Sequence, residues 1–168
     1  MPQTFDVDRE AQGAYAVDWS VFLDPADSIS TSAWTLDSGL TEVSSDTRQT
    51  TGTAQAGAAK TITLAASGPS ATDHYYRYLW VRIYSGTGAG QHRRILSYIA
   101  ATKVCIVDRE WDITPDSTSK YIIAAAVIVL KFDSAVLGRR YSASNLITTA
   151  ASPPIKEPLT LHFRVVEK

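Results

Sequence analysis

YYRYLWVRIYSGTGAGQHRRILSYIAATKVCIVDREW, residues 75–111, is the stretch that decides the fold of this chain. Apolar side chains alternate with polar or aromatic ones over residues 79–84, which is the period of a half-buried strand. The next segment, SGTGAGQ at residues 85–91, is too rich in glycine for a regular element and predicts a turn with positive φ angles. Further strands are expected over 92–99 and 103–107. Because the connections are short, these three strands predict an antiparallel meander.

The segments on either side of the meander also read as strands, because apolar and polar residues alternate or β-branched residues dominate. No segment carries an apolar stripe at helical spacing for three turns, so the predicted fold class is all-β. Residues 1–13 are polar and are expected to be irregular, and Ser44–Gly57 is expected to be a loop or a linker. The expected strands are Tyr15–Trp19, Ile29–Leu36, Leu40–Val43, Lys60–Ala65, Tyr141–Thr148 and Leu159–Val166. Tyr121–Phe132 is expected to form one long strand or two consecutive strands.

The order of these segments predicts one β domain inserted into another. We expect residues 50–122 to form a small antiparallel module, and residues 1–49 plus 123–168 to form a discontinuous β-sandwich. Neither outer piece has enough strands to bury two faces alone. Trp19 and Trp34 are expected in the core of that sandwich. The insertion is expected to project from an edge or end of the sandwich, because it enters and leaves between two strands.

Composition and charge argue against several kinds of partner. The formal net charge is −1 and there is no long basic run, so nucleic acid is not expected to bind. The longest uncharged apolar run, Tyr121–Leu130, has 10 residues, whereas a membrane-spanning helix needs about 20. The first ten residues, MPQTFDVDRE, do not resemble a signal peptide. The single cysteine, Cys105, lies in an apolar strand and is expected to be a small buried side chain.

No pattern in the sequence predicts catalysis, a cofactor or a metal. The glycine turn does not match the GxGxxG spacing, and neither a helix nor a lysine follows it, which disfavours a phosphate-binding loop. Counting from Asp108, an EF-hand would need glycine at residue 113 and a carboxylate at residue 119, which are Ile113 and Ser119. The three histidines lie on separate segments without metal-ligand spacing. We therefore expect no enzyme activity, no cofactor and no metal.

The outer segments resemble a family of small phage tail proteins, the fiber–tail adaptors, which are immunoglobulin-like sandwiches. The similar motifs are Tyr-x-x-Asp-Trp, Ser-x-Trp and Tyr-x-x-x-Asn-x-Ile-Thr-Thr, followed by an apolar final strand. In this chain they comprise Tyr15, Asp18, Trp19, Ser32, Trp34, Tyr141, Asn145, Ile147, Thr148 and Thr149. The turn before Tyr141 lacks the family's glycine-rich composition, and the family sandwich is usually uninterrupted.

The insertion is similar to a β module found in phage tail and other virion proteins. The residues that carry this resemblance are the SGTGAGQ turn, the Thr-Lys-Val strand at 102–104, Trp111 and the PDSTSKY end at 115–121. Together, the two resemblances imply an immunoglobulin-like sandwich interrupted by a small antiparallel β module.

The resemblances imply a non-enzymatic virion structural protein, most simply a tail adaptor that links tail or connector proteins to fibers. It would assemble in the host cytoplasm without a signal peptide. The implied partners are other virion proteins, in a homo-oligomeric ring or another multi-copy assembly, with neither nucleic acid nor membrane. The alternatives are a capsid decoration or head-fiber protein, or a module that binds host glycans through its aromatic residues.

The insertion is expected to supply the contacts with neighbouring proteins. Aromatic residues before and within its first strand offer contact area, and the tip of its glycine hairpin has little apolar mass to bury. The candidate interface residues are Tyr75, Tyr76, Tyr78, Trp80, Gly86, Gly88, Gly90 and Gln91.

Overall fold

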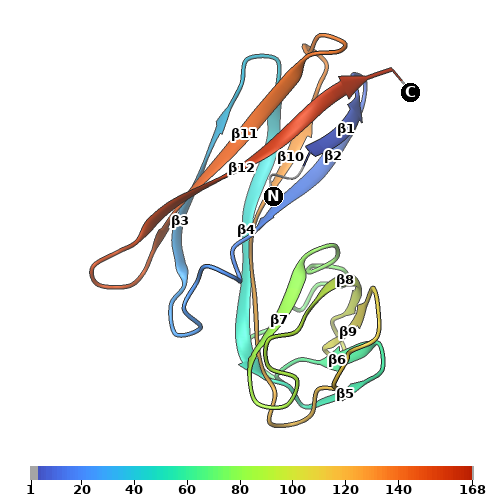
Figure 1. Ribbon diagram of the computed structural model, residues 1–168, viewed down its shortest axis with the longest axis vertical. Coiled ribbons are helices and arrows are strands. Elements are labelled where there is room, and N and C mark those ends of the chain that lie inside the picture. Colours follow the sequence, from blue (N-terminus) through green and yellow to red (C-terminus); the bar gives the residue numbers. More distant parts are fainter. Residues whose placement is uncertain (1–3, 168) are drawn as a thin grey trace. The chain divides into compact units, whose positions relative to one another are not determined.

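The computed structural model describes residues 4–167 and confirms the predicted fold class. Strands, turns and loops make up this part of the chain, and it contains no helix. Figure 1 shows the strands. Their bounds are β1 (Thr4–Asp8), β2 (Gln12–Asp18), β3 (Ile29–Leu36), β4 (Thr41–Thr53), β5 (Ala56–Ala58), β6 (Thr61–Thr63), β7 (Trp80–Ser85), β8 (His92–Ile99), β9 (Val104–Val107), β10 (Lys120–Lys131), β11 (Arg140–Thr149) and β12 (Lys156–Val166).

The chain divides into two compact units. The sandwich unit comprises residues 4–17, 27–47 and 126–167 of the described chain, and the inserted unit comprises residues 18–26 and 48–125. The insertion was expected over residues 50–122, and the main segment of the inserted unit in the structure is residues 48–125. Residues 18–26 also join the inserted unit, which the sequence did not suggest.

Trp19 illustrates this difference. It is fully buried, as expected of a core residue, but it lies in the segment that joins the inserted unit and not in the sandwich. Its backbone N–H donates to the carbonyl oxygen of Ala124 at 2.8 Å, at the end of the inserted segment. Trp34 is partly buried on β3, in the sandwich unit.

One sheet of the sandwich unit has the strand order β1-β12-β11-β3. The pairs β12–β11 and β11–β3 are antiparallel, whereas β1 lies parallel to β12. The prediction that residues 1–13 are irregular is wrong for residues 4–8 and 12–13, which belong to strands, and residues 1–3 lie outside the described chain. Phe5 and Val7 alternate with Asp6 and Asp8, a pattern too short to stand out in the polar surroundings.

Aromatic side chains fill the core of the sandwich unit. Phe163 on β12 is stacked on Phe5 at 5.6 Å between ring centres and meets Tyr15 edge-on at 4.8 Å. Phe132, just after β10, lies 5.3 Å from Phe163. These rings come from β1, β2, β12 and the end of β10, so they join segments that are far apart in the sequence. Such pairs stabilise a core beyond the area that they bury.

The predicted loop or linker at Ser44–Gly57 is wrong. Residues 41–53 form the long strand β4, which pairs with β10, and β5 follows almost at once. The segment has few large apolar residues, but threonine is common in it, and a β-branched residue suits a half-exposed strand. Tyr121–Phe132, expected as one long strand or two, lies in the single strand β10 up to Lys131, and β10 is buried along most of its length.

The inserted unit is built on the predicted meander. β7 pairs antiparallel with β8, and β8 pairs antiparallel with β9. On its other side β9 pairs antiparallel with β6, and β6 pairs antiparallel with β5. The core of the unit consists of fully buried side chains that include Ile62, Leu64, Val81, Ile83, Ile95, Tyr98, Cys105 and Tyr121.

Candidate contact surface of the inserted unit

The SGTGAGQ segment forms the turn between β7 and β8, as predicted. Gly86, Gly88 and Gly90 have φ angles of 79°, 78° and 90°, which residues with a Cβ atom rarely adopt. A Cβ atom at Gly86 would collide with the carbonyl oxygen of Thr118. At Gly88 it would lie 3.0 Å from the carbonyl oxygen of Ile113. The first two glycines therefore let the turn pack directly against the backbone of residues 113–118.

The side chain of Gln91 fastens the turn to the loop after Trp111. Its amide nitrogen donates to the carbonyl oxygens of Gly88 at 3.1 Å and Ile113 at 3.0 Å. Its amide oxygen accepts from the backbone N–H groups of Asp112 at 2.7 Å and Ile113 at 3.2 Å. One side chain thus satisfies four backbone groups on two segments that lie about twenty residues apart.

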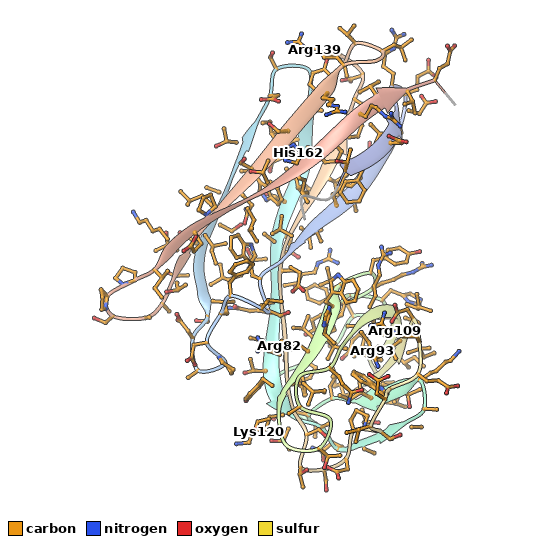
Figure 2. All side chains as sticks on the ribbon, viewed as in Figure 1. Arg82, Arg93, Arg109, Lys120, Arg139 and His162 are labelled. Atoms are coloured by element: carbon orange, nitrogen blue, oxygen red, sulfur yellow. The ribbon has the colours of Figure 1, made fainter. Side chains whose placement is uncertain are left out.

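Arg93, labelled in Figure 2, extends this network into the protein. Its side chain is 3% exposed and donates to the carbonyl oxygens of Glu110 and His92, both at 2.9 Å. It also pairs with the exposed carboxylate of Asp112 at 3.0 Å. The guanidinium lies over the ring of Trp111, 5.3 Å from its centre. A buried charge is costly unless it is paired and hydrogen-bonded, and here every side of the group has a partner.

A second set of hydrogen bonds joins the turn to residues 116–119. Thr118 Oγ1 donates to Asp116 Oδ1 at 2.6 Å and accepts from the backbone N–H of Thr87 at 3.2 Å. Ser119 Oγ donates to the carbonyl oxygen of Thr87 at 2.6 Å. Hydrogen bonds from Thr118 lower the pKa of Asp116 because they stabilise its carboxylate. We call these bonds, together with those of Gln91 and Arg93, the Gln91 network.

The Gln91 network accounts for most of the distinctive residues of the insertion. Gly86, Gly88 and Gln91, which were predicted at an interface, hold the turn to its own unit. The carboxylates of Asp108, Asp112 and Asp116, which follow one another closely in the sequence, have separate local partners. Asp112 pairs with Arg93, Asp116 caps the 116–119 turn, and Asp108 accepts from the backbone N–H of Arg94 at 3.1 Å. In residues 4–167, no cluster of three His, Cys, Asp or Glu side chains could hold a metal ion.

The predicted aromatic residues divide into buried and exposed ones. Tyr76 is 1% exposed, and its hydroxyl accepts from the backbone N–H of Ser70 at 2.9 Å. Burial raises its pKa. Tyr75 is half-buried, and the guanidinium of Arg48 lies 4.7 Å from its ring centre. Tyr76 therefore serves the core of the inserted unit, and its ring offers no surface to a partner of this chain.

Tyr78 is the most exposed of the predicted aromatic residues, at 50%. The guanidinium carbons of Arg77 and Arg94 lie 4.6 and 5.1 Å from its ring centre. Its backbone has a φ of 68°, held by an N–H bond to the carbonyl oxygen of Ile95 at 2.7 Å. Tyr78, Arg77 and Arg94 form what we call the Tyr78 patch.

Trp80 and His92 border the Tyr78 patch on the paired strands β7 and β8. Their ring centres are 4.9 Å apart, and Trp80 lies opposite Arg94 in the strand register. Both rings belong to side chains that are at least partly exposed. The sequence pointed to Tyr78 and Trp80 as aromatic residues on this segment. It gave no reason to add Arg77 and Arg94, because only the folded backbone brings their guanidinium groups onto one ring.

Cys105 is buried in the inserted unit, as predicted. Burial raises the pKa of its thiol to about 12, so the thiolate is scarce at neutral pH. Gly90 is exposed and has open space around it. Of the predicted interface residues, Tyr75, Tyr78, Trp80, Gly86, Gly90 and Gln91 keep at least part of their surface accessible.

A scan against protein-family models finds no match to this chain, and searches of curated proteins and of solved structures find no similar protein. No helix in residues 4–167 is long and apolar enough to cross a membrane.

Proposed function

We propose that this chain is a non-enzymatic structural protein of a phage virion, a tail adaptor that joins tail or connector proteins to fibers. The proposal begins from the two sequence resemblances, one for the sandwich unit and one for the insertion. Its partners would be other virion proteins, and contact with them would be made through the inserted unit.

The observation that carries the proposal is the Tyr78 patch. A bulky side chain with a positive φ is a strained outlier, and such strain gathers at functional positions. Here the strain turns a large aromatic ring outward between arginine side chains. Tyrosine and arginine are the residue types that dominate the binding energy of protein interfaces. The patch therefore has the composition and the geometry of a contact point for another protein.

The Gln91 network supports a structural role for the distinctive motif. Its glycines, Gln91 and Arg93 are bonded to their own unit and leave the motif without a free catalytic group. A unit held in this way presents the Tyr78 patch without a large ordering cost on binding, which favours affinity.

Glycan binding is the less favoured function for these aromatic residues. A sugar stacks on an open ring face, but guanidinium groups already lie over Tyr78 and the imidazole of His92 lies beside Trp80. A capsid decoration or head-fiber protein would use the same kind of contact surface as an adaptor. The position in the particle separates those two possibilities.

Substitutions in the Tyr78 patch test the proposal in assembled particles. Replacing Tyr78 by alanine in the full chain should leave a folded protein and reduce its incorporation into particles at least about tenfold, since a tyrosine at an interface hot spot contributes about 2 kcal/mol or more. Ile113→Ala is the matched control, because Ile113 is an apolar residue of the same unit that is 58% exposed. Normal incorporation of Tyr78→Ala would contradict the proposed contact.

Substitution is a cleaner test than removing the insertion. A deletion of Thr51–Tyr121 bridged by Gly and Ser would expose Trp19, which is fully buried in the inserted unit. The shortened chain could then fail to assemble through misfolding alone. A glycan array run with the same purified protein covers the alternative function: specific saccharide binding that is lost in Tyr78→Ala would favour a glycan-binding module.

A further inference from the structure

The strand β3 forms an edge of the sandwich sheet and pairs only with β11 in the strand order of the described chain. Figure 1 shows β3 beside β11. Its sequence, ISTSAWTL, has eight residues and contains no charge, proline or glycine. Natural proteins commonly block an open edge with charged residues, proline, bulges or a very short strand. The register of β3 with β11 shifts only near Ile29, and the rest of β3 has no bulge, charge or proline.

The opposite edge of the same sheet is protected. β1 has five residues, two of which are aspartates. Asp6 accepts two hydrogen bonds from the guanidinium of Arg164, both at 2.8 Å. The contrast between the two edges singles out β3 as the place where another strand can add to the sheet.

The backbone groups that β3 offers can be assigned from its register. Leu36 is opposite Ala143 in the register, and one residue further the N–H of Asp37 donates to the carbonyl oxygen of Ser142 at 3.1 Å. In an antiparallel pair, hydrogen-bonded positions alternate with positions whose backbone groups point away. Odd-numbered residues of β3 therefore bond to β11. The N–H and C=O groups of Ser32, Trp34 and Leu36 point toward the open edge.

The side chains along this edge are also incompletely covered. Ser32, Trp34 and Leu36 face inward but are only partly buried. Their register partners on β11, Ile147, Asn145 and Ala143, are fully buried. On the other face of β3, Thr31, Ala33 and Thr35 are exposed.

We propose that the occupant of this edge is β3 of a second copy of the chain, paired antiparallel about a two-fold axis at Ala33. This register places Thr31 opposite Thr35 of the second copy and Ala33 opposite its own counterpart. Opposite residues then have the same parity, so they lie on the same face of the sheet. The outward-pointing N–H and C=O groups of Ser32 then bond to those of Trp34 in the second copy, and those of Trp34 bond to Ser32 in the second copy.

The side chains suit this register. On the outer face the opposed residues are threonines or alanines, and threonine pairs across strands are favourable. On the inner face each tryptophan is opposite a serine, so a large side chain meets a small one. Because β3 carries no charge, no like charges are brought together. A two-fold pairing uses the same surface on both copies and closes as a dimer. This inference does not depend on whether the chain belongs to a virion.

Charge at the two-fold axis tests the proposal in the full-length protein. The wild-type chain should form a dimer in sedimentation equilibrium. Ala33→Lys should weaken dimerisation about tenfold or more, because it opposes two lysines across the axis. Ala33→Glu should do the same. An equal mixture of the two variants should restore the dimer, since lysine then faces glutamate. His162→Lys is the matched control, because His162 is partly exposed on β12, two strands from β3, and is labelled in Figure 2.

Hydrogen exchange provides a second readout that does not require a variant. The amides of Ser32, Trp34 and Leu36 should become protected as protein concentration rises, while those of Ala33 and Thr35 should be protected at all concentrations. A wild-type chain that stays monomeric at its solubility limit, a dimer that persists in folded Ala33→Lys, or a mixture that fails to restore the dimer would overturn the proposal.

Discussion

At the scale of single residues, the glycines of the SGTGAGQ turn have different structural roles. All three have positive φ angles, but only the position of Gly90 has open space around it. We predict that Gly90→Ala costs about 1–2 kcal/mol, the strain of a side chain in the left-handed region. Gly86→Ala should cost clearly more, because its Cβ would meet the backbone of Thr118. Urea unfolding of both variants measures the difference, and equal costs would contradict this packing.

Asp18 predicts a dependence of stability on pH. Burial raises its pKa, although Arg82, His92 and a hydrogen bond from the N–H of Ser20 at 2.9 Å oppose the rise. A carboxylate with a raised folded-state pKa binds its proton more tightly in the folded protein, so its ionisation destabilises the fold as pH increases. Asp18→Asn keeps an oxygen acceptor for Ser20 and removes the charge.

We therefore expect Asp18→Asn to be more stable than the wild type at pH 7. The advantage should shrink as the pH falls through the raised pKa toward 3.8, the ordinary value for an aspartate. Thermal unfolding of both proteins across this range measures the effect. An Asp18→Asn variant that loses stability at pH 7 would mean that the favourable charge interactions and hydrogen bonds of the carboxylate outweigh the cost of its burial.

At the scale of elements, the Gln91 network is the feature that fixes the turn between β7 and β8. Gln91→Ala should lower the free energy of unfolding by about 1–3 kcal/mol, because it removes the acceptor of the backbone N–H groups of Asp112 and Ile113. Gln55→Ala is a matched control in the same unit. Gln55 is exposed, and its one described side-chain bond, to the carbonyl oxygen of Thr53, is 3.3 Å long. Equal stability losses in chemical denaturation would argue against the network.

The sequence predicted elements well where the alternation was long and the apolar residues were large. The meander of β7, β8 and β9 and the long strand β10 were found in this way. β1 was missed because only Phe5 and Val7 mark it, and its strand pairing is with β12, which lies at the other end of the chain. Only the first residues of β4, within the expected strand Leu40–Val43, were predicted, because the rest of β4 is mostly small and polar. Its strand form depends on its partner β10 and not on its own burial.

The candidate site was predicted only in part, for a similar reason. Aromatic residues at 75–80 were visible in the sequence, but which of them is exposed depends on the backbone. The positive φ at Tyr78 turns that ring outward, whereas Tyr76 packs against Tyr98 at 4.9 Å in the core. Residue type alone does not reveal that the backbone of Tyr78 has a positive φ angle. The network role of Gln91 was hidden as well, because its partners lie about twenty residues away.

At the scale of the whole molecule, the chain combines a sandwich with an open strand edge and an insertion with an exposed aromatic patch. We thus propose one contact surface on each unit: β3 for a second copy of the chain, and the Tyr78 patch for a different protein. Two separate contact surfaces are what an adaptor needs, since it must hold its own neighbours and its partner together.

The central claim is that the Tyr78 patch joins this chain to a neighbouring protein of a phage particle. A density map of the assembled particle at side-chain resolution tests it most directly. The account predicts that the chain is present in the tail and that Tyr78, Arg77 and Arg94 are buried against a different protein. A particle without this chain, or a map in which the Tyr78 patch faces solvent in every copy, would contradict it.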